Sequence, residues 1–432
     1  MLQRIVVVGG GAGGLELATR LGRSLGKRKQ AKIILVDANL THIWKPLLHE
    51  VATGSLNSTD NELNYVAQAK WNHFEFQIGR FSGIDRQAKT IELSATLDEK
   101  GYELVPARSL AYDILVIAVG SLTNDFGTKG AAQHCVFLDT PEHALNFHQR
   151  LLGEYLSAHA KGDYDNKVNI AIVGAGATGV ELAAELRRAA QQLSAYGLGN
   201  IQPENMGISL IEAGPRVLPA LSEKIANEVH QQLLKLGVDV KLAAAVEEVT
   251  ADGMRIKDGS FIPATLKVWA AGVRAPKCLT ELDGLATNRI NQLLVHTTLQ
   301  TTEDENIFAL GDCAACPLSE GSDKNVPPRA QTAHQQAKFL NKALALKLQG
   351  KPLPRYQYRD YGSLVSLSEY SAVGNIMGSL IRTVSVEGWM ARMFYISLYR
   401  MHQMVLYGVF RTALIMLSDR IGKRTHPRMK LH

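Results

Sequence analysis

Two glycine-rich turns of the same kind occur in this chain, and each lies between an apolar strand and a helix. The first turn follows residues 4–8 and the second follows residues 168–173. Their glycines are Gly9, Gly11, Gly13 and Gly14 in the first turn and Gly174, Gly176 and Gly179 in the second. In this context a G-x-G-x-x-G turn lets the backbone approach a pyrophosphate, while the helix N-terminus supplies free N–H groups. The sequence therefore predicts two dinucleotide-binding domains.

An acidic residue ends the second predicted strand of each unit. Asp37 follows the apolar residues 33–36, and Glu212 follows residues 208–211. A carboxylate at this point accepts hydrogen bonds from the ribose hydroxyls of a dinucleotide. Glu212 would repel a 2′-phosphate, which favours NADH over NADPH at the second turn, although the nearby Arg216 could soften this preference. The interval before Glu212 is lengthened by residues 190–206, which we expect to form an extended insertion.

The size and charge of the chain bound what it can be. Its 432 residues are enough for two or three domains with their own cores. The formal net charge is +6, and residues 382–432 contribute to the excess because Glu387 and Asp419 are their only acids. We find no signal-peptide pattern and no apolar run of about 18 residues, so we expect a cytosolic chain without a spanning helix. The chain has four cysteines, which fits a reducing compartment where structural disulfides are rare. We expect no nucleic acid partner.

The order of the predicted strands places the second unit inside the first. Residues 114–119 have the composition of a buried parallel strand that ends at Gly120, and residues 266–270 resemble them and end before Gly272. Residues 306–310 form a later strand, ending before Asp312, that we expect to return to the first unit. The expected boundaries are 1–125 with 282–385 for the first domain, 126–164 for its linker region, 165–281 for the second domain and 386–432 for a C-terminal region.

Several longer motifs resemble those of the type II NADH:quinone oxidoreductases, which are single-subunit, non-pumping respiratory flavoproteins. The resemblance covers essentially the whole chain, and its marks are WKPLLHEVATG at 44–54, GATGVE at 176–181, Gly311-Asp312, and AQTAHQ at 330–335. It implies an α/β fold with two Rossmann-like domains, the second inserted in the first, and a C-terminal amphipathic helical segment. It also implies a non-covalent FAD at the first turn and NADH, as substrate, at the second.

The resemblance assigns roles to single residues. Those expected to contact FAD are Gly9, Gly11, Gly13, Gly14, Asp37, Lys45, Pro46, Gly120 and Asp312. Those expected to contact NADH are Gly174, Gly176, Gly179, Glu181, Glu212 and Gly272. Glu181 is expected beside the nicotinamide, where it would orient the carboxamide or relay a proton, or else complement the dipole of its helix.

Two glutamines are the candidate quinone ligands, and with Glu181 they complete the expected catalytic residues. Gln331 and Gln335 lie one helical turn apart and therefore face the same side. Neutral amides can hydrogen-bond quinone carbonyls, and the helix after Pro328 would direct its positive end at the flavin, where charge grows on reduction. From spacing alone such glutamines are usually solvent-facing, and the resemblance reverses that expectation. We expect His49 and His334 to be structural.

The pair Cys313 and Cys316 has the spacing of a redox dithiol or of half a metal site. No second C-x-x-C is present to complete a zinc site, so we expect no metal and two structural thiols, with a minor redox or copper role as the alternative. Residues 42–56 contain no cysteine, which argues against a disulfide reductase and a sulfide:quinone reductase. A ferredoxin or rubredoxin reductase and a redox sensor stay open as other functions.

Residues 389–410 are predicted to form one amphipathic helix. Its apolar face holds Phe394, Leu398, Met401, Val405 and Val409, while the opposite face carries Arg392, Arg400, Gln403 and Arg411. The segment 412–417 and the basic residues after it could bind anionic headgroups. This pattern predicts that residues 389–432 attach the protein to a membrane surface, and the resemblance implies the cytoplasmic face of a bacterial inner membrane. The alternative is that this helix packs on the first domain or forms a homodimer interface.

Overall fold

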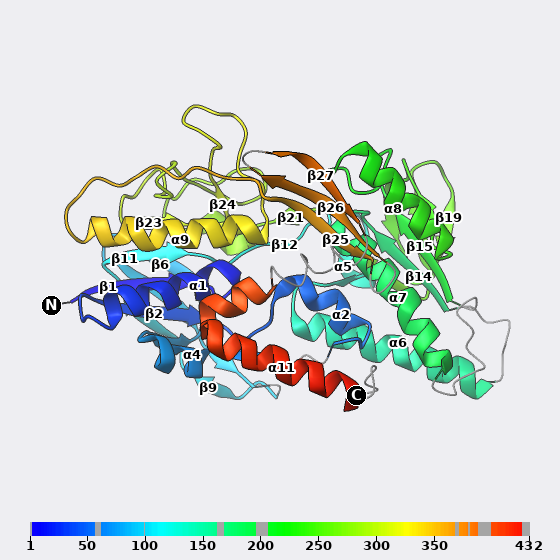
Figure 1. Cartoon of the computed structure of the whole chain (residues 1–432), viewed down its shortest axis with the longest axis horizontal. Helices are drawn as coiled ribbons and strands as arrows, with labels where there is room; N and C mark the ends of the chain where they lie inside the picture. Colours follow the sequence, from blue (N-terminus) through cyan, green and yellow to red (C-terminus); the bar gives the residue numbers. More distant parts are fainter. Residues whose placement is uncertain are drawn as a thin grey trace.

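The computed structural model describes residues 2–56, 62–98, 100–161, 168–195, 206–367, 371–378, 381–387 and 399–425. Two parallel sheets form the two halves of the molecule, and a separate antiparallel sheet lies beside the second half (Figure 1). The C-terminal helix α11 (Val409–Thr425) returns to the side of the first half.

The first parallel sheet is built from strands that are far apart in the sequence. Its order is β23 (Ile307–Ala309), β11 (Ile114–Ile117), β1 (Gln3–Val8), β2 (Ala31–Asp37) and β5 (Glu75–Ile78). The side chains of β11 and β23 are fully buried, which explains their continuous apolar sequences. Because β23 pairs in parallel with β11, the predicted return of the late strand to the first unit is confirmed.

The second parallel sheet repeats this arrangement. Its order is β13 (Val136–Phe137), β20 (Leu266–Trp269), β14 (Val168–Val173), β15 (Met206–Ile211) and β16 (Asp239–Lys241). In both sheets the strand before the glycine turn lies between the strand that ends in an acid and the later buried strand. The two units are therefore structural relatives.

The helices cover these sheets through buried apolar faces. They are α1 (Ala12–Leu21) with a π-helical extension (Gly22–Gly26), α2 (Leu48–Ala52), α4 (Tyr65–Asn72), α5 (Ala131–His134), α6 (Pro141–Lys161), α7 (Ala177–Ala195), α8 (Glu223–Lys235) and α9 (Ala330–Lys347). Helix α1 packs against α9 on the first unit. Helix α7 continues to Ala195, so residues 190–195 are helical and not the extended start of an insertion. Residues 196–205 lie outside the described residues.

The segment expected to link the domains contributes to the second core. Phe147, Leu151 and Tyr155 of α6 are buried at helical spacing in the same cluster as the apolar residues of β14. Strand β13 joins the second sheet beside β20. Residues 131–161 thus pack with the second unit, although we expected them to belong to the first. Helix α2 also packs on α6 and α7 and carries part of the WKPLLHEVATG motif to the second core.

Smaller sheets surround the two units. The antiparallel strands are β6 (Arg80–Asp85) with β7 (Thr90–Ser94) and β10 (Arg108–Ala111), β8 (Thr96–Leu97) with β9 (Glu103–Val105), β3 (Thr41–His42) with β4 (Leu63–Asn64), and β17 (Val246–Val249) with β18 (Gly253–Ile256) and β19 (Phe261–Pro263). Strand β22 (Leu293–Leu294) pairs in parallel with β24 (Ala314–Ala315). Strand β12 (Leu122–Thr123) pairs with β21 (Val273–Arg274) where the chain passes between the units.

A three-stranded antiparallel sheet follows α9 and lies beside the second unit. Its strands are β25 (Gly362–Leu367), β26 (Ser371–Gly378) and β27 (Ile381–Glu387). Strand β25 contacts α7, and β26 contacts α8 (Figure 1). The end of the range expected for the first domain therefore forms a separate sheet against the helices of the second.

The predicted single helix 389–410 is interrupted. Residues 399–407 are helical, but Gly408 has a φ of +82°, a left-handed conformation that ends the helix before α11 begins. The buried residues are His402, Gln403 and Leu406, so the face toward the protein is not the predicted apolar face. Residues 388–398, with Arg392, Phe394 and Leu398, lie outside the described residues. Among the helices that are described, none is long and apolar enough to span a bilayer.

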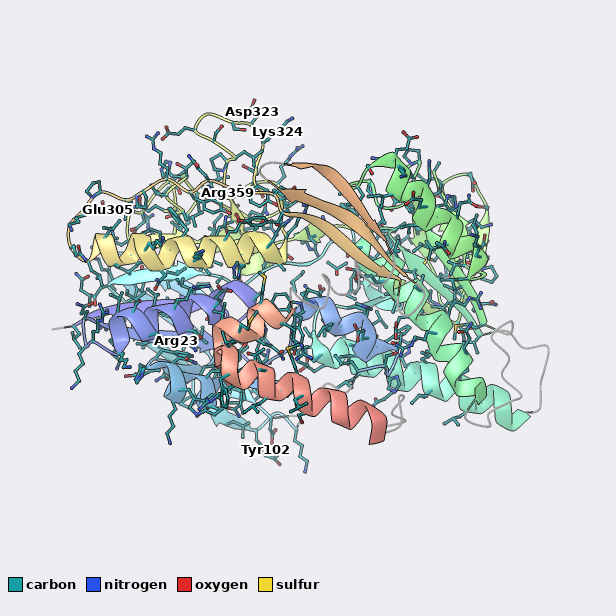
Figure 2. All side chains as sticks on the ribbon, in the orientation of Figure 1. Arg23, Tyr102, Glu305, Asp323, Lys324 and Arg359 are labelled. Atoms are coloured by element: carbon teal, nitrogen blue, oxygen red, sulfur yellow. The ribbon has the colours of Figure 1, made fainter. Side chains whose placement is uncertain are left out.

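The first unit holds this C-terminal helix through specific contacts. The guanidinium of Arg23 donates to the carbonyl oxygens of Val405 and Leu406 at 2.7 and 2.8 Å, near the helix C-terminus where a cation is favoured (Figure 2). The His402 ring lies 4.4 Å from that of Trp44 and 5.4 Å from that of His42. The C-terminal segment is therefore packed on the first unit, as one of the two alternatives foresaw.

Candidate functional site

The two glycine turns have the same backbone geometry. Gly9 and Gly174 have φ values of +97° and +99°, which side chains other than glycine rarely adopt. A Cβ on Gly14 would overlap the carbonyl oxygen of Gly9, and a Cβ on Gly179 would overlap that of Gly174. Both turns therefore need glycine where the helix passes closest to the preceding strand.

The acid after each second strand holds its turn. The N–H of Gly10 donates to Oδ2 of Asp37 at 2.6 Å, and the N–H of Ala175 donates to Oε2 of Glu212 at 2.8 Å. Burial raises the pKa of Asp37, and the hydrogen bond from Gly10 opposes that shift. Each carboxylate thus lies beside its glycine turn, where a dinucleotide ribose is expected.

Asp312 connects the late strand to the loop after β11. Its Oδ2 accepts from the hydroxyl of Ser121 at 2.7 Å, and burial raises its pKa while this bond and Lys45 lower it. Nζ of Lys45 lies 2.8 Å from the carbonyl oxygen of Ser121 and 3.1 Å from Oδ1 of Asp139. Lys45, Gly120 and Asp312 are therefore brought together, as expected for residues around one cofactor.

The open backbone at these turns fits a bound dinucleotide. A Cβ on Gly11, Gly120 or Gly176 would meet no atom within 4 Å, so one side of the backbone is free at each position. The N-terminus of α1 has no side-chain cap and no acid in its first turn. Free N–H groups in that position suit a pyrophosphate. Gly272 differs, because the ring of Phe126 covers the side that a Cβ would occupy.

Glu181 lies in the buried first part of α7, next to His49 of the WKPLLHEVATG segment. Its Oε2 is 3.8 Å from Nδ1 of His49, and the two side chains are only 8% and 5% exposed. His49 belongs to α2, which packs on α7. The WKPLLHEVATG segment and the GATGVE segment therefore meet at this point, although they are distant in the sequence.

The first unit has an equivalent carboxylate that the sequence analysis did not identify. Glu16 lies two residues after Gly14, as Glu181 lies two residues after Gly179. Its side chain is 1% exposed, and its Oε2 is 2.8 Å from Nδ1 of His334 on α9. A residue-by-residue alignment of the two turns would have found this acid, but not its partner.

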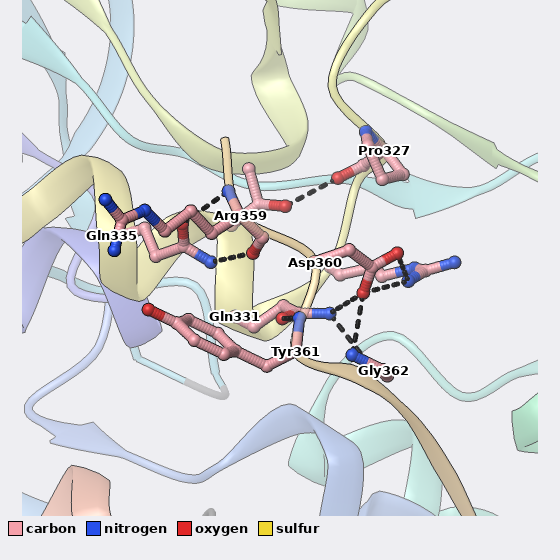
Figure 3. A network of polar contacts seen from close by, with 9 residues as sticks. Pro327, Gln331, Gln335, Arg359, Asp360, Tyr361 and Gly362 are labelled. Carbon is pink, nitrogen blue, oxygen red and sulfur yellow. Dashed lines mark hydrogen bonds and ion pairs between the residues drawn. The ribbon is translucent and has the colours of Figure 1, made fainter. Parts of the chain in front are cut away.

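Gln331 and Gln335 face the same side of α9, but their amides hold a neighbouring segment. Gln335 donates to the carbonyl oxygen of Arg359 at 2.8 Å and accepts from its N–H at 3.1 Å. Gln331 donates to the carbonyl oxygen of Gly362 at 2.9 Å and accepts from the N–H of Tyr361 at 3.2 Å (Figure 3). The two side chains therefore fix residues 359–362 beside the first turns of α9.

Asp360 completes this network. Its Oδ1 accepts from the N–H of Gly362 at 2.8 Å and from Gln331 at 3.3 Å, and its Oδ2 lies 3.3 Å from the guanidinium of Arg329 (Figure 3). Arg329 is the residue before α9, so the segment 359–362 is tied to the start of that helix. The sequence offered no signal for this contact.

Cys313 and Cys316 are buried free thiols. Burial raises the pKa of each thiol to about 12, which keeps it protonated and unreactive at neutral pH. Sγ of Cys313 lies 3.2 Å from the carbonyl oxygen of Leu310. The part of the chain that the structure describes contains no group of three or more His, Cys, Asp or Glu side chains that could hold a metal.

Known proteins resemble this chain over its full length. Residues 3–337 match the model of the pyridine nucleotide-disulphide oxidoreductase family. A type II NADH:quinone oxidoreductase of Haemophilus influenzae is 47% identical, with 100% of both chains covered. One from Staphylococcus aureus strain NCTC 8325 is 29% identical over 88% of this chain and 91% of its own. The fold matches that of NDH2 from Plasmodium falciparum in complex with NADH, with a TM-score of 0.82, 18% identity and 99% of each chain covered. The chain therefore belongs to the type II NADH:quinone oxidoreductases.

Proposed function

We propose that this chain is a peripheral membrane flavoenzyme that transfers two electrons from NADH through FAD to a membrane quinone. The observation that supports it best is the pair of matching glycine turns, because one turn can keep a permanent cofactor while the other exchanges a nucleotide. Membership of the type II NADH:quinone oxidoreductases implies a reaction that does not pump protons. FAD accepts a hydride and passes on its electrons, and the protein's task is placement.

The residues around the first turn are proposed to hold FAD. Asp37 would accept from the adenosine ribose, and the free N–H groups at Gly11 and Gly13 would bind the pyrophosphate. Asp312, fixed by Ser121, would contact the ribityl chain or phosphate. The remaining members of this proposed FAD site are Gly9, Gly14, Lys45, Pro46 and Gly120.

The second turn is proposed to bind NADH. Glu212 would accept from the adenosine ribose and exclude a 2′-phosphate, and Glu181 would orient the carboxamide beside the flavin. The remaining members of the proposed NADH site are Gly174, Gly176, Gly179 and Gly272. The domain boundaries that we propose place this turn within residues 165–281, with residues 131–161 packing on the same sheet.

Anaerobic titration tests the electron path. NADH should bleach the yellow flavin, and a short-chain quinone should restore its colour. NADPH should bleach it far less readily, because Glu212 would face the adenosine ribose and repel a 2′-phosphate. If NADPH and NADH bleach the flavin equally, Glu212 is not the selector; if the quinone fails to restore the colour, the proposed acceptor is wrong.

Gln331 and Gln335 are proposed to act at the quinone side. Their position on the first turns of α9 supports this role, but their amides already hold residues 359–362. We therefore infer that they orient this segment or exchange these bonds for a quinone carbonyl. Gln331→Ala should slow quinone reduction more than NADH oxidation by an artificial acceptor. Equal losses in the two assays would remove the assigned role.

The C-terminal segment is proposed to bind the cytoplasmic face of a bacterial inner membrane. Phe410, Leu414 and Leu417 are spaced along one side of α11 and are 77%, 51% and 57% exposed. Their apolar surface suits the lipid interface, and the basic C-terminal sequence suits anionic headgroups. Deleting residues 389–432 should release the protein from membranes. Sedimentation of the truncated protein with membranes would reject this assignment, and a dimer that needs these residues would support the homodimer alternative.

A further inference from the structure

Quinone reduction by NADH requires a proton that NADH does not supply. In the balanced reaction, NADH, a quinone and one proton give NAD⁺ and quinol. NADH loses a hydride, which carries two electrons and one proton, and the quinone gains two electrons and two protons. One proton per turnover must therefore come from solvent and reach the quinone.

We propose that Glu16 and His334 form the relay that delivers this proton. The inference rests on the proposed quinone reduction, and it concerns two residues with no role in the sites described above. Oε2 of Glu16 lies 2.8 Å from Nδ1 of His334. The carboxylate is buried, with 1% of its side chain exposed, whereas 28% of the His334 side chain is exposed. The pair thus joins a shielded carboxylate to an imidazole that solvent can reach.

The environment of Glu16 fixes which ring nitrogen exchanges a proton. Oε1 of Glu16 accepts from Nε of Arg20 at 2.8 Å in an ion pair, so the other carboxylate oxygen is left for His334. A carboxylate that pairs with a guanidinium accepts hydrogen bonds, so the relay that we propose assigns Nδ1 of His334 as the donor to Oε2 of Glu16. This leaves Nε2 of His334 as the atom that gains and loses the proton. The same carboxylate stabilises the imidazolium form while the proton is carried.

The position of His334 places the relay at the quinone side. His334 lies three residues after Gln331 and directly before Gln335, and side chains at i and i+3 are neighbours on a helix. The charged or titratable groups around it are Glu16 and Arg20 of α1, Lys338 of α9, and His402 of the helix 399–407. Burial lowers the pKa of His402, and His42 and then His334 add smaller contributions in the same direction.

The contact between Glu16 and His334 joins α1 to α9, and a second contact, from the π-helical extension of α1 to α9, lets its structural role be separated from proton transfer. Ser24 and Asn341 make a second bridge between the segment after α1 and α9, with Oγ of Ser24 2.9 Å from Oδ1 of Asn341. That bridge carries no group that titrates near neutral pH. It provides a matched control, because removing it loosens the same interface without removing a proton carrier.

The first experiment compares two acceptors in the full-length holoenzyme. A short-chain quinone needs electrons and protons, whereas ferricyanide takes electrons only. His334→Gln and Glu16→Gln should each lower kcat with the quinone by about a hundredfold or more, since general acid catalysis contributes roughly 10²–10⁴. Both should keep the ferricyanide rate within about twofold, and Ser24→Ala should change neither rate. Equal losses with both acceptors would overturn the proposal, as would an unchanged quinone rate.

The second experiment separates proton transfer from packing. Added imidazole should restore quinone reduction in His334→Ala in proportion to the imidazolium concentration, and it should leave Ser24→Ala unchanged. Proton uptake on rapid mixing with quinone, followed with a pH-indicator dye, should be slowed in His334→Gln. Flavin content and the unfolding temperature check that the variants are folded. A failure of rescue together with normal proton uptake rejects the relay, whereas a wild-type enzyme that reduces ferricyanide but no quinone rejects the proposed acceptor.

Discussion

The two glycine-rich turns have the same backbone geometry, but different parts of the chain pack against them. Gly13 in the first turn is buried, and a Cβ there would overlap the side chain of Leu310 and press on Ala333 of α9. The matching position in the second turn is Thr178, which is exposed. At this one position the first turn is packed against the rest of the chain, whereas the second turn is open to solvent. This difference is the one expected between a cofactor that stays bound and a substrate that exchanges.

The largest expected effect comes from closing either turn. A Cβ at Gly14 or Gly179 meets a backbone carbonyl that cannot move aside, so we expect each alanine variant to weaken its own nucleotide by about 3 kcal/mol, roughly a hundredfold. Gly14→Ala should be purified without flavin. Gly179→Ala should keep FAD, which dithionite reduces normally, but NADH should reduce it only at much higher concentration. If Gly179→Ala also loses FAD, the two sites are not independent.

The second prediction compares the two acids. Asp37→Ala and Glu212→Ala each leave the N–H of the turn without its partner and remove the proposed ribose contact, which should cost about 1–3 kcal/mol of binding. Asp37→Ala should raise the FAD dissociation constant, measured by fluorescence. Glu212→Ala should raise the KM for NADH and lower that for NADPH. An NADPH KM that does not change would show that Arg216 or another group sets the preference.

The third prediction concerns pH at the contact between the C-terminal helix and the first unit. Burial lowers the pKa of His42 to about 4 and that of His402 well below its usual value, so both rings are neutral when folded. Unfolding or release lets them take up protons below about pH 6.5. Stability should therefore be lost as pH falls, on the order of 1 kcal/mol per pH unit for His42 between about pH 6.5 and 4, and His402 should add a loss in the same direction below about pH 6.5.

Limited proteolysis between pH 7 and 5 measures this release. Cleavage after residue 398 should accelerate as the pH falls, and His42→Leu should reduce the acceleration. Cleavage that is equally fast in both proteins at every pH would contradict the expected role of the buried rings.

The smallest expected effect directly tests the difference in packing between Gly13 of the first turn and Thr178 of the second. Gly13→Ala should destabilise the protein by about 1–2 kcal/mol, because the clash is with a Leu310 side chain that can partly move. Thr178→Ala, at an exposed position, should change stability by less than about 0.5 kcal/mol. Thermal unfolding of the two holoproteins makes the comparison. A similar loss in both variants would remove the distinction between an enclosed and an open turn.

The sequence predicted what depends on local pattern and on repetition. Apolar runs that end at glycine or at an acidic residue were enough to predict the two glycine turns and their acids. The same pattern predicted the late strand before Gly311. The interruption at Gly408 was missed, because a glycine inside a helical pattern is often tolerated and only its left-handed φ shows the break.

Contacts between distant segments were beyond reach of the sequence. Glu16 has a visible equivalent in Glu181, but its partner His334 is on a helix over three hundred positions away, and no pattern links them. Likewise the amides of Gln331 and Gln335 were expected to be available to a quinone, whereas residues 359–362 now accept and donate their hydrogen bonds. Such pairs depend on how α1, α9 and residues 359–362 pack together. The local periodicity of a single sequence does not show this packing.

The pairing of β23 with β11 also sets an order of events during synthesis. The strands of the second sheet are complete once residue 269 has left the ribosome, whereas the first sheet waits for residues 307–309. The first sheet, whose strand β1 is synthesised first, must therefore lack its edge strand β23 until the whole inserted unit has been produced. Long-range pairing of this kind is slow because loop closure precedes any stabilising contact. The nascent chain should thus be able to bind NADH before it can hold FAD.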